Sequence, residues 1–293
     1  MRELRQGGEQ AAGGHGRILP VNPDTGWQLG DLASALQTRR RTEREPVVPI
    51  TVPSTELAVF ELRQYTLRPG RREELIELFD REFVESQEEC GAAVVGQFRD
   101  LDDPDRFVWR RGFRDIAVRH EALAAFYGGP VWAEHGPAAN ATMADSDDVL
   151  LLRPLVEGGG PAVERSGRPR AGSPAPDRFV SVLVRSFPPG RDEGPALVRD
   201  GLLPLLGETG PAPLAALTTE TARNTFARLP VRTGENVAVI LTSYPDEAAQ
   251  AEHLAALRDH PLAREEILPA LARERIAPDL TLRLAPTARS LLR

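Results

Sequence analysis

The chain has 293 residues, a net charge of −7 and a single cysteine, Cys90. The acidic balance argues against a nucleic-acid-binding surface. One cysteine excludes an intramolecular disulfide and a zinc site built on several thiolates. Every basic residue is an arginine, which excludes Schiff-base and lysine general-base mechanisms. The length allows one large domain or two ordinary ones.

No apolar run approaches the ~18 residues of a membrane span, and the N-terminus lacks the apolar stretch of a signal peptide. We therefore expect a cytoplasmic protein that binds neither membranes nor nucleic acid. Residues 1–57 are rich in Gly and Pro. Such a segment buries too little apolar surface to offset its conformational entropy, so we expect a disordered N-terminal tail over residues 1–57.

The first folded domain is expected over residues 58–156. Residues 60–67 alternate polar and apolar side chains as a β-strand does, and Pro69 with Gly70 supplies a turn that ends it. Residues 71–89 place large apolar side chains every four positions, which predicts an amphipathic helix. The other predicted elements are strands over 92–98, 106–113 and 149–155, a helix from the N-cap Asp115 to Tyr127, and a helix over 130–143 that Pro137 breaks.

A Gly- and Pro-rich linker over residues 157–177 leads to a second domain over residues 178–286. This domain repeats the first, since residues 68–79 align with 188–199. Its further elements are strands over 179–187, 237–241 and 280–284, a helix over 246–257, and a segment over 260–265 that matches 129–134.

The order β-α-β-β-α-β, with an extra helix before the last strand, is the ferredoxin-like plan. The first strand carries Phe60 and Leu62 on one face and Glu61, Arg63 and Tyr65 on the other. Helices cover only one face of such a sheet, so the second sheet is expected to cover the other. The predicted fold is α+β: two tandem ferredoxin-like repeats whose antiparallel sheets pack into one barrel. The protein would be a monomer with an intramolecular barrel, or a homodimer through other surfaces.

Three motifs of the first domain are distinctive: the Glu-Leu-Arg-x-Tyr-Thr strand at 61–66, the Pro-Gly-Arg turn at 69–71 and the Phe-Val-Trp strand core at 107–109. They resemble the NIPSNAP family, a branch of the dimeric α/β-barrel superfamily. The resemblance covers residues 58–155. It extends to the second domain in outline only, where the strand motif becomes Val182 to Ser186.

By this resemblance, relatives in the superfamily include cofactor-independent quinone-forming monooxygenases, haem-degrading oxygenases, dye-decolourising peroxidases and chlorite dismutases. They hold an aromatic substrate or haem between sheet and helices. Because a fold does not determine a function, two classes remain open. One is a monooxygenase-like enzyme of secondary metabolism that binds or oxidises a small aromatic, quinol-type molecule without a tightly bound cofactor. The alternative is a non-catalytic ligand-binding or protein-interaction module.

Residues 106–143 concentrate Trp, Tyr, His and Arg in a chain that is only 5% aromatic, which predicts a cleft in the first domain. His135 or Tyr127 is expected to take a phenolic proton, while Arg111 stabilises the oxyanion. His135 equally fits a haem axial ligand or a surface residue. The repeat favours a role, because His135 aligns with Glu266.

The predicted substrate-binding residues are Trp109, Trp132, Arg63, Tyr65 and Asn140. The two indole rings suit stacking on a planar ligand or ordinary core packing. Arg63, like Arg111, suits a bound carboxylate or phenolate, or an ion pair with Glu61 inside the barrel.

The other polar candidates have similar alternatives. Tyr65 and Tyr127 suit a hydrogen bond to a substrate oxygen or a place at the end of the barrel. Asn140 suits a bound carbonyl or the cap of a helix that restarts after Pro137. No metal site is expected, because the acidic residues at 145–148 lack the Gly-spaced loop and bidentate Glu of a calcium site.

Overall fold

The structure is a computed structural model that describes residues 57–161 and 164–293. These residues belong to one compact unit, Pro49–Arg293. The predicted disordered tail lies outside the described residues, apart from Leu57.

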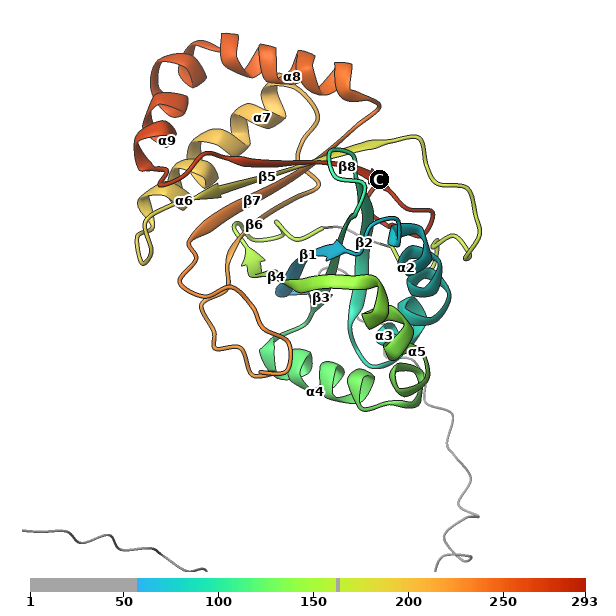
Figure 1. The fold of residues 1–293 in the computed structure, drawn as a ribbon. Helices are drawn as coiled ribbons and strands as arrows, with labels where there is room; N and C mark the ends of the chain where they lie inside the picture. Colours follow the sequence, from blue (N-terminus) through green and yellow to red (C-terminus); the bar gives the residue numbers. More distant parts are fainter. Residues whose placement is uncertain (1–56, 162–163) are drawn as a thin grey trace, which may run out of the picture. The chain divides into compact units, whose positions relative to one another are not determined.

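The first repeat contains four strands and a layer of helices (Figure 1). In chain order its elements are β1 (Val59–Leu67), α2 (Arg72–Leu78), the π-helix η3 (Phe79–Phe83), α3 (Val84–Glu89), β2 (Ala93–Asp100), β3 (Arg106–Phe113), α4 (Ile116–Tyr127), α5 (Pro130–Thr142) and β4 (Met143–Pro154).

The second repeat follows the same plan. Its elements are β5 (Phe179–Ser186), α6 (Glu193–Leu197), η4 (Val198–Leu202), α7 (Leu203–Thr209), β6 (Ala215–Thr219), β7 (Val237–Tyr244), α8 (Glu247–Asp259), η5 (Ala263–Ile267), α9 (Leu268–Glu274) and β8 (Leu280–Pro286). Sequence patterns did not predict β6, a five-residue strand whose one large apolar side chain is Leu217.

The eight strands close into one antiparallel barrel in the order β1-β3-β2-β8-β5-β7-β6-β4. Each repeat contributes a four-stranded sheet. The two sheets join where β2 pairs with β8 and β4 pairs with β6, through three residue pairs at each junction. The prediction of two sheets in one barrel is therefore confirmed. Figure 1 shows helices α6–α9 on one side of the strands and α2–α5 on the other.

Side-chain alternation on β1 separates the barrel interior from the helix layer. Phe60 and Leu62 lie in an apolar core built from strand residues of both repeats, together with Val182 and Leu284. The opposite face of β1 contacts the helices of its own repeat, where Tyr65 packs in a cluster with α2 and η3 residues. The polar face of β1 thus lies between sheet and helices, outside the barrel interior.

Helix α5 corrects one prediction. It runs without interruption through Pro137, so the predicted break is wrong and Asn140 does not begin a new helix. Only one backbone hydrogen bond is lost at a proline N, and the flanking turns continue the helix. Gly136 allows the Trp132 ring to lie against the same helix, because a Cβ at Gly136 would come within 2.6 Å of that ring.

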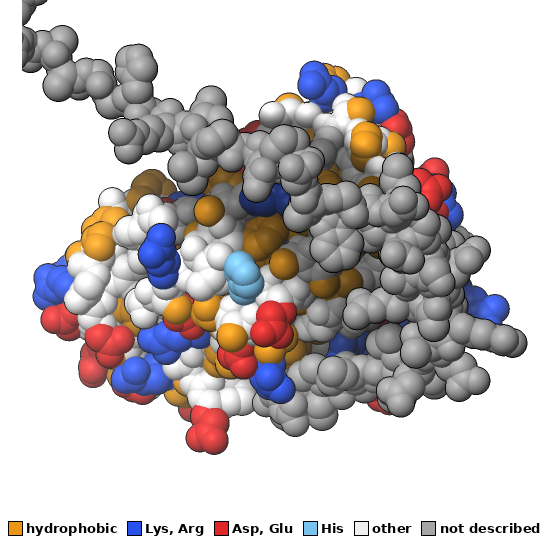
Figure 2. Space-filling model, turned by 90° about the horizontal axis from the view of Figure 1, so that it is seen from below, with side chains coloured by type: hydrophobic (Ala, Val, Ile, Leu, Met, Phe, Trp, Pro, Cys, Tyr) orange, Lys and Arg blue, Asp and Glu red, His pale blue; other side chains and the backbone are white. Residues whose placement is uncertain are grey.

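The described part of the face seen in Figure 2 carries charges of both signs. Acidic and basic side chains are interspersed with hydrophobic ones on the described part of this face (Figure 2). No helix in residues 57–161 or 164–293 is long and apolar enough to cross a membrane.

Candidate functional site

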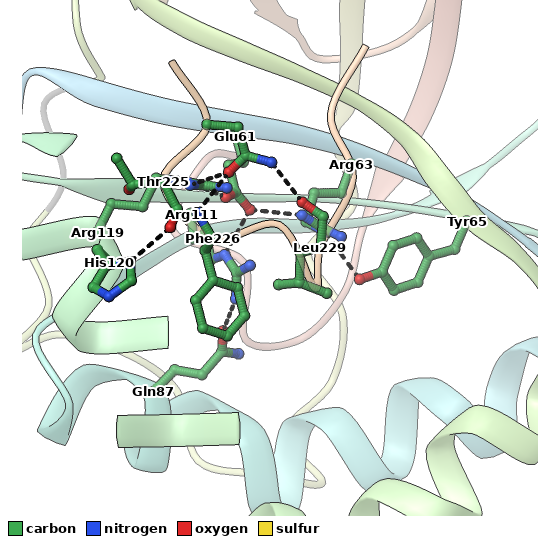
Figure 3. Close-up of polar contacts among 11 residues, drawn as sticks. Glu61, Arg63, Tyr65, Gln87, Arg111, Arg119, His120, Thr225, Phe226 and Leu229 are labelled. Atoms are coloured by element: carbon green, nitrogen blue, oxygen red, sulfur yellow. Dashed lines mark hydrogen bonds and ion pairs between the residues drawn. The ribbon is translucent and has the colours of Figure 1, made fainter. Parts of the chain in front are cut away.

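Glu61 on β1 lies at the centre of three buried arginines (Figure 3). Its Oε2 accepts hydrogen bonds from Nη1 of Arg63 and Nε of Arg111, both at 2.7 Å. Its Oε1 accepts from Nε of Arg119 at 2.6 Å. Arg63 is 1% exposed and the other three residues are fully buried. We call these four residues the Glu61 cluster.

Local structure explains how the cluster forms. Alternation along β1 puts Glu61 and Arg63 on one face, and the pairing of β1 with β3 places Arg111 opposite Glu61. Arg119 comes from α4, whose predicted N-cap Asp115 accepts a hydrogen bond from a first-turn backbone N–H. The ion pairs foreseen as an alternative for Arg63 and Arg111 do form, but between sheet and helices instead of inside the barrel.

The cluster holds three positive charges and one negative charge. Burial alone would raise the pKa of Glu61, but Arg111, Arg63 and Arg119 outweigh burial and hold that pKa well below its usual range. Burial also acts to lower the pKa of Arg63, and here Tyr65 and Glu61 outweigh it and raise the pKa. A bound anion would compensate this net excess of two buried positive charges.

Two guanidinium nitrogens in the cluster are unused. Nη2 of Arg111 and Nη2 of Arg119 are buried and have no hydrogen-bond partner among the described residues. A buried donor without a partner costs free energy. An ionised oxygen satisfies such a donor best, because charge-assisted hydrogen bonds are the stronger kind.

Neighbouring side chains orient the arginines. Nη1 of Arg111 donates to Oε1 of Gln87 on α3 at 2.8 Å, and Nε of Arg63 donates to the Tyr65 hydroxyl at 2.9 Å. Burial raises the pKa of Tyr65, although Arg63 acts to lower it. Tyr65 is therefore neutral at neutral pH and is an acceptor toward Arg63.

Aromatic rings form one side of the cluster. The guanidinium carbon of Arg111 lies 5.0 Å from the Trp109 ring centroid and 5.9 Å from that of Tyr127. Tyr127 contacts Trp132 edge-on, with 4.7 Å between ring centroids. Tyr65 contacts Trp109 in the same way at 5.8 Å. Six of the eight predicted site residues, Arg63, Tyr65, Trp109, Arg111, Tyr127 and Trp132, are thus brought together.

The other two predicted residues lie apart from these contacts. His135 is half-buried on α5, with Nε2 3.4 Å from Oε2 of Glu82 on η3. Asn140 is exposed in the last part of α5. Its side chain has no hydrogen-bond partner among the described residues.

A loop of the second repeat, residues 220–236, covers the cluster, and we call it the covering loop. The Asn224 side-chain oxygen accepts from Nη1 of Arg119 at 2.9 Å. The Thr225 carbonyl accepts from the His120 ring at 2.8 Å. Phe226 stacks on Tyr127, with 6.1 Å between centroids (Figure 3 shows Phe226 beside the cluster). Sequence reasoning missed this loop and Arg119, because neither belongs to a local motif.

Residues 60–156 match the family model described as NIPSNAP. This part of the chain belongs to the NIPSNAP family. The match contains all four residues of the Glu61 cluster, as well as Trp109, Tyr127 and His135. No curated protein matches the chain in sequence.

Solved structures resemble the chain at low identity. A candidate monooxygenase from Lactobacillus acidophilus NCFM is 15% identical over 78% of this chain and 94% of its own, with a TM-score of 0.48. An anthrone oxidase-like protein is 14% identical over 80% of this chain and 94% of its own, with a TM-score of 0.46. A NIPSNAP family protein of unknown function from Agrobacterium tumefaciens str. c58 is 21% identical over 34% of this chain and 89% of its own, with a TM-score of 0.32.

The predicted alignment of the second repeat with the first needs a shift of one residue. The predicted alignment matched Glu61 with Val182, but Val182 lies in the barrel core and Glu61 faces the helices. A shift of one residue reverses the faces of a strand. Counting from the Pro-Gly-Arg turns at 69–71 and 189–191 makes Ser181 the equivalent of Glu61 and Leu183 the equivalent of Arg63. The second repeat therefore lacks the charged cluster.

The described part of the chain, including the first repeat, contains no candidate metal centre. No group of three or more His, Cys, Asp or Glu side chains that could hold a metal ion occurs in residues 57–161 and 164–293. The site offers hydrogen-bond donors, positive charge and aromatic rings, which together suit an anionic aromatic molecule.

Proposed function

We propose that the first repeat binds a small planar aromatic molecule with an ionised oxygen, and that the bound anion reacts with dioxygen. The observation that carries this proposal is the Glu61 cluster. It combines an excess of two buried positive charges with the unpartnered Nη2 groups of Arg111 and Arg119. The family resemblance, with its aromatic substrates between sheet and helices, supports the same location.

In this proposal the ligand oxygen accepts hydrogen bonds from Nη2 of Arg111 and Arg119. The ligand ring lies against Trp109 and Tyr127, which already contact Arg111. The covering loop moves to admit the ligand, which breaks the Asn224 contact to Arg119 and the stacking of Phe226 on Tyr127. Loop motions of this kind exclude water once the ligand is bound.

The proposed reaction is the oxidation of a hydroxyanthrone-type molecule. Removal of one proton gives an anion whose negative charge lies on the oxygen and on the ring carbon. Dioxygen converts the ring CH2 group to a carbonyl, and the second oxygen atom leaves as water. The arginines lower the pKa of the bound molecule by stabilising its anion. The electrons that reduce dioxygen come from the substrate itself.

Tyr127 and His135 are the proposed proton acceptors. Tyr127 lies within the cluster contacts, whereas His135 is oriented by Glu82. Removing a true proton acceptor lowers a rate by about 10²–10⁴-fold and leaves binding of the anion largely unchanged.

The binding step is tested by titrating a hydroxyanthrone into the protein while following Trp fluorescence. Arg119→Gln keeps a hydrogen-bond donor but removes one positive charge, so its Kd should rise by about 10-fold or more. Arg114→Gln is the matched control, because Arg114 is exposed and, among the described residues, pairs with Asp115 alone. Equal Kd values for Arg119→Gln and the wild type would contradict the proposal.

The chemical step is tested by oxygen consumption with the same molecule. His135→Ala is compared with Glu266→Ala, its counterpart in the second repeat. A loss of rate confined to His135→Ala identifies the proton acceptor, and equal rates leave that role to Tyr127. Binding without oxygen consumption by the wild type would reduce the function to the non-catalytic ligand-binding module.

A further inference from the structure

A cavity of about 380 Å³ lies between the sheet and the helices of the second repeat. This volume is in the range of small-molecule sites. Strands β5 and β8 and the segment before β8 form one wall, and η4, α7, α8 and α9 form the other. Twelve residues line it, among them Ser181, Leu183, Arg185, Gln250, Arg258 and Asp279.

This cavity occupies the place that the Glu61 cluster fills in the first repeat. Asp115 and Asp246 cap α4 and α8 in the same way, so Gln250 corresponds to Arg119. Nε2 of Gln250 donates to Oγ of Ser181 at 2.7 Å, as Arg119 donates to Glu61. The second repeat keeps this link between helix and sheet in uncharged form.

The space opens because smaller or apolar side chains replace the cluster. Leu183 stands where the first repeat has Arg63, and it is half-buried at the cavity wall. Six of the twelve lining residues are leucines, and none is aromatic. The cavity therefore suits a flexible aliphatic body better than the aromatic site of the first repeat does.

The charged residues of the lining favour a single negative charge on the ligand. Arg185 makes two hydrogen bonds to Asp279, at 2.8 and 2.6 Å, and its Nη1 has no partner among the described residues. Arg258 is exposed and forms no ion pair within the part of the chain that the structure describes. Two arginines and one aspartate leave one net positive charge.

We propose that the second-repeat cavity binds a small aliphatic monocarboxylate. Its carboxylate lies toward Arg258 and Arg185, and its chain lies among the leucines. This site is separate from the first-repeat cluster and does not rest on the function proposed for it. The probe is decanoate, with decanol as the uncharged comparison, and binding is measured by titration calorimetry on the full chain.

We expect decanoate to bind the wild type and decanol to bind about 10-fold or more weakly, since a charge-assisted hydrogen bond is lost. Arg258→Glu reverses the charge of this exposed arginine and should weaken decanoate binding by about 10-fold or more. Arg68→Glu is its matched control, because Arg68 is equally exposed but lies in the first repeat. Arg68→Glu should bind as the wild type does.

Leu183→Phe tests the cavity itself, since the larger ring takes up its volume. It should abolish measurable binding, whereas Leu101→Phe, at a side chain 47% exposed, should not. Arg119→Gln separates the two sites and should leave decanoate binding unchanged. The proposal is overturned if decanoate does not bind, if Arg258→Glu and Leu183→Phe both bind normally, or if only Arg119→Gln loses binding.

Discussion

Nε of Arg119 on α4 lies 2.6 Å from Oε1 of Glu61 on β1, and this hydrogen bond ties the helix layer of the first repeat to its sheet. The second repeat makes the same connection between Gln250 and Ser181 at 2.7 Å. One connection carries charge and is surrounded by buried arginines, and the other is neutral and borders a cavity. The two copies of one scaffold therefore offer different chemistry at corresponding places.

Replacing Glu61 by Gln should strongly destabilise the protein. Three buried arginines would lose their shared carboxylate, and breaking a buried ion pair by removing one partner costs about 3–5 kcal/mol. Urea unfolding at pH 7 measures the loss. Glu74→Gln is the control, because Glu74 is half-exposed and Arg71 is its one ion-pair partner in the part of the chain that the structure describes. It should change the unfolding midpoint little.

The effect of Glu61→Gln should depend on pH in a defined direction. The pKa of Glu61 is lowered in the folded state from the ordinary value of 4.5, so the unfolded state binds the proton first as pH falls. The stability that the carboxylate contributes is complete above that value and is lost below it. The difference in free energy of unfolding between wild type and variant should be constant from pH 6 to 8 and shrink below about pH 4.5. A gap that grows on acidification would contradict this assignment.

Arg110 should be replaceable by Met with a gain in stability. Arg110 is fully buried, and its three guanidinium nitrogens have no hydrogen-bond partner among the described residues. It lies over the Phe60 ring at 5.7 Å, and burial lowers its pKa to about 9. Met removes this charge, so the free energy of unfolding at pH 7 should rise by roughly 3–5 kcal/mol.

The sign of the Arg110 effect can be checked by pH and by a neighbour. Above about pH 9 the folded state releases the Arg110 proton while the unfolded state keeps it, so the free energy of unfolding of the wild type rises. The difference in free energy of unfolding between the wild type and Arg110→Met should therefore narrow. Arg111→Met should instead destabilise, because Arg111 holds Glu61 and Gln87. A loss of stability in Arg110→Met at pH 7 would contradict the assignment of Arg110 as a buried charge without a partner among the described residues.

Asp80→Asn should stabilise the protein above pH 6. Asp80 on η3 is 7% exposed, and its Oδ1 has no hydrogen-bond partner among the described residues. Burial raises its pKa to about 6, although Arg289 acts to lower it. The folded state holds the proton between pH 3.8 and about 6, so wild-type stability falls as pH rises through this range.

Thermal unfolding of Asp80→Asn at several pH values tests this assignment. Above pH 6 the variant should be more stable by about 2–3 kcal/mol, and the difference should disappear below about pH 4. Asp259→Asn, at an exposed position on α8, should show no such pH dependence. A variant that is equally stabilised at pH 3.5 and pH 8 would exclude ionisation of Asp80 as the cause.

An isolated fragment of residues 58–156 should dimerise. Alone it exposes Phe60, Leu62, Val108 and Leu150, which face the second sheet in the barrel, and it frees the edges of β2 and β4. Exposed apolar surface and unpaired edges both favour association. Sedimentation equilibrium compares it with the full chain. A fragment that stays monomeric at tens of micromolar would contradict this expectation.

Local patterns in the sequence were enough to predict much of the fold. Alternation over 60–67 and 106–113 gave β1 and β3, because side chains on a strand point to opposite faces. Asp115 marked the start of α4, because its side chain caps the first turn. The repeated order of elements and the uncovered sheet face predicted one barrel. The aromatic and basic residues of 106–143 predicted a candidate site in the first repeat.

Tertiary structure alone decided how that site is built. Arg119 and Glu61 are 58 positions apart, and the covering loop comes from the other repeat, so no local pattern connects them. Burial of Val182 in the barrel core decided that Ser181, and not Val182, is equivalent to Glu61, because a one-residue shift reverses the face of every side chain on a strand. The second-repeat cavity depends on the side-chain volumes of several elements packed together, and packing of that kind is set only when the chain is folded.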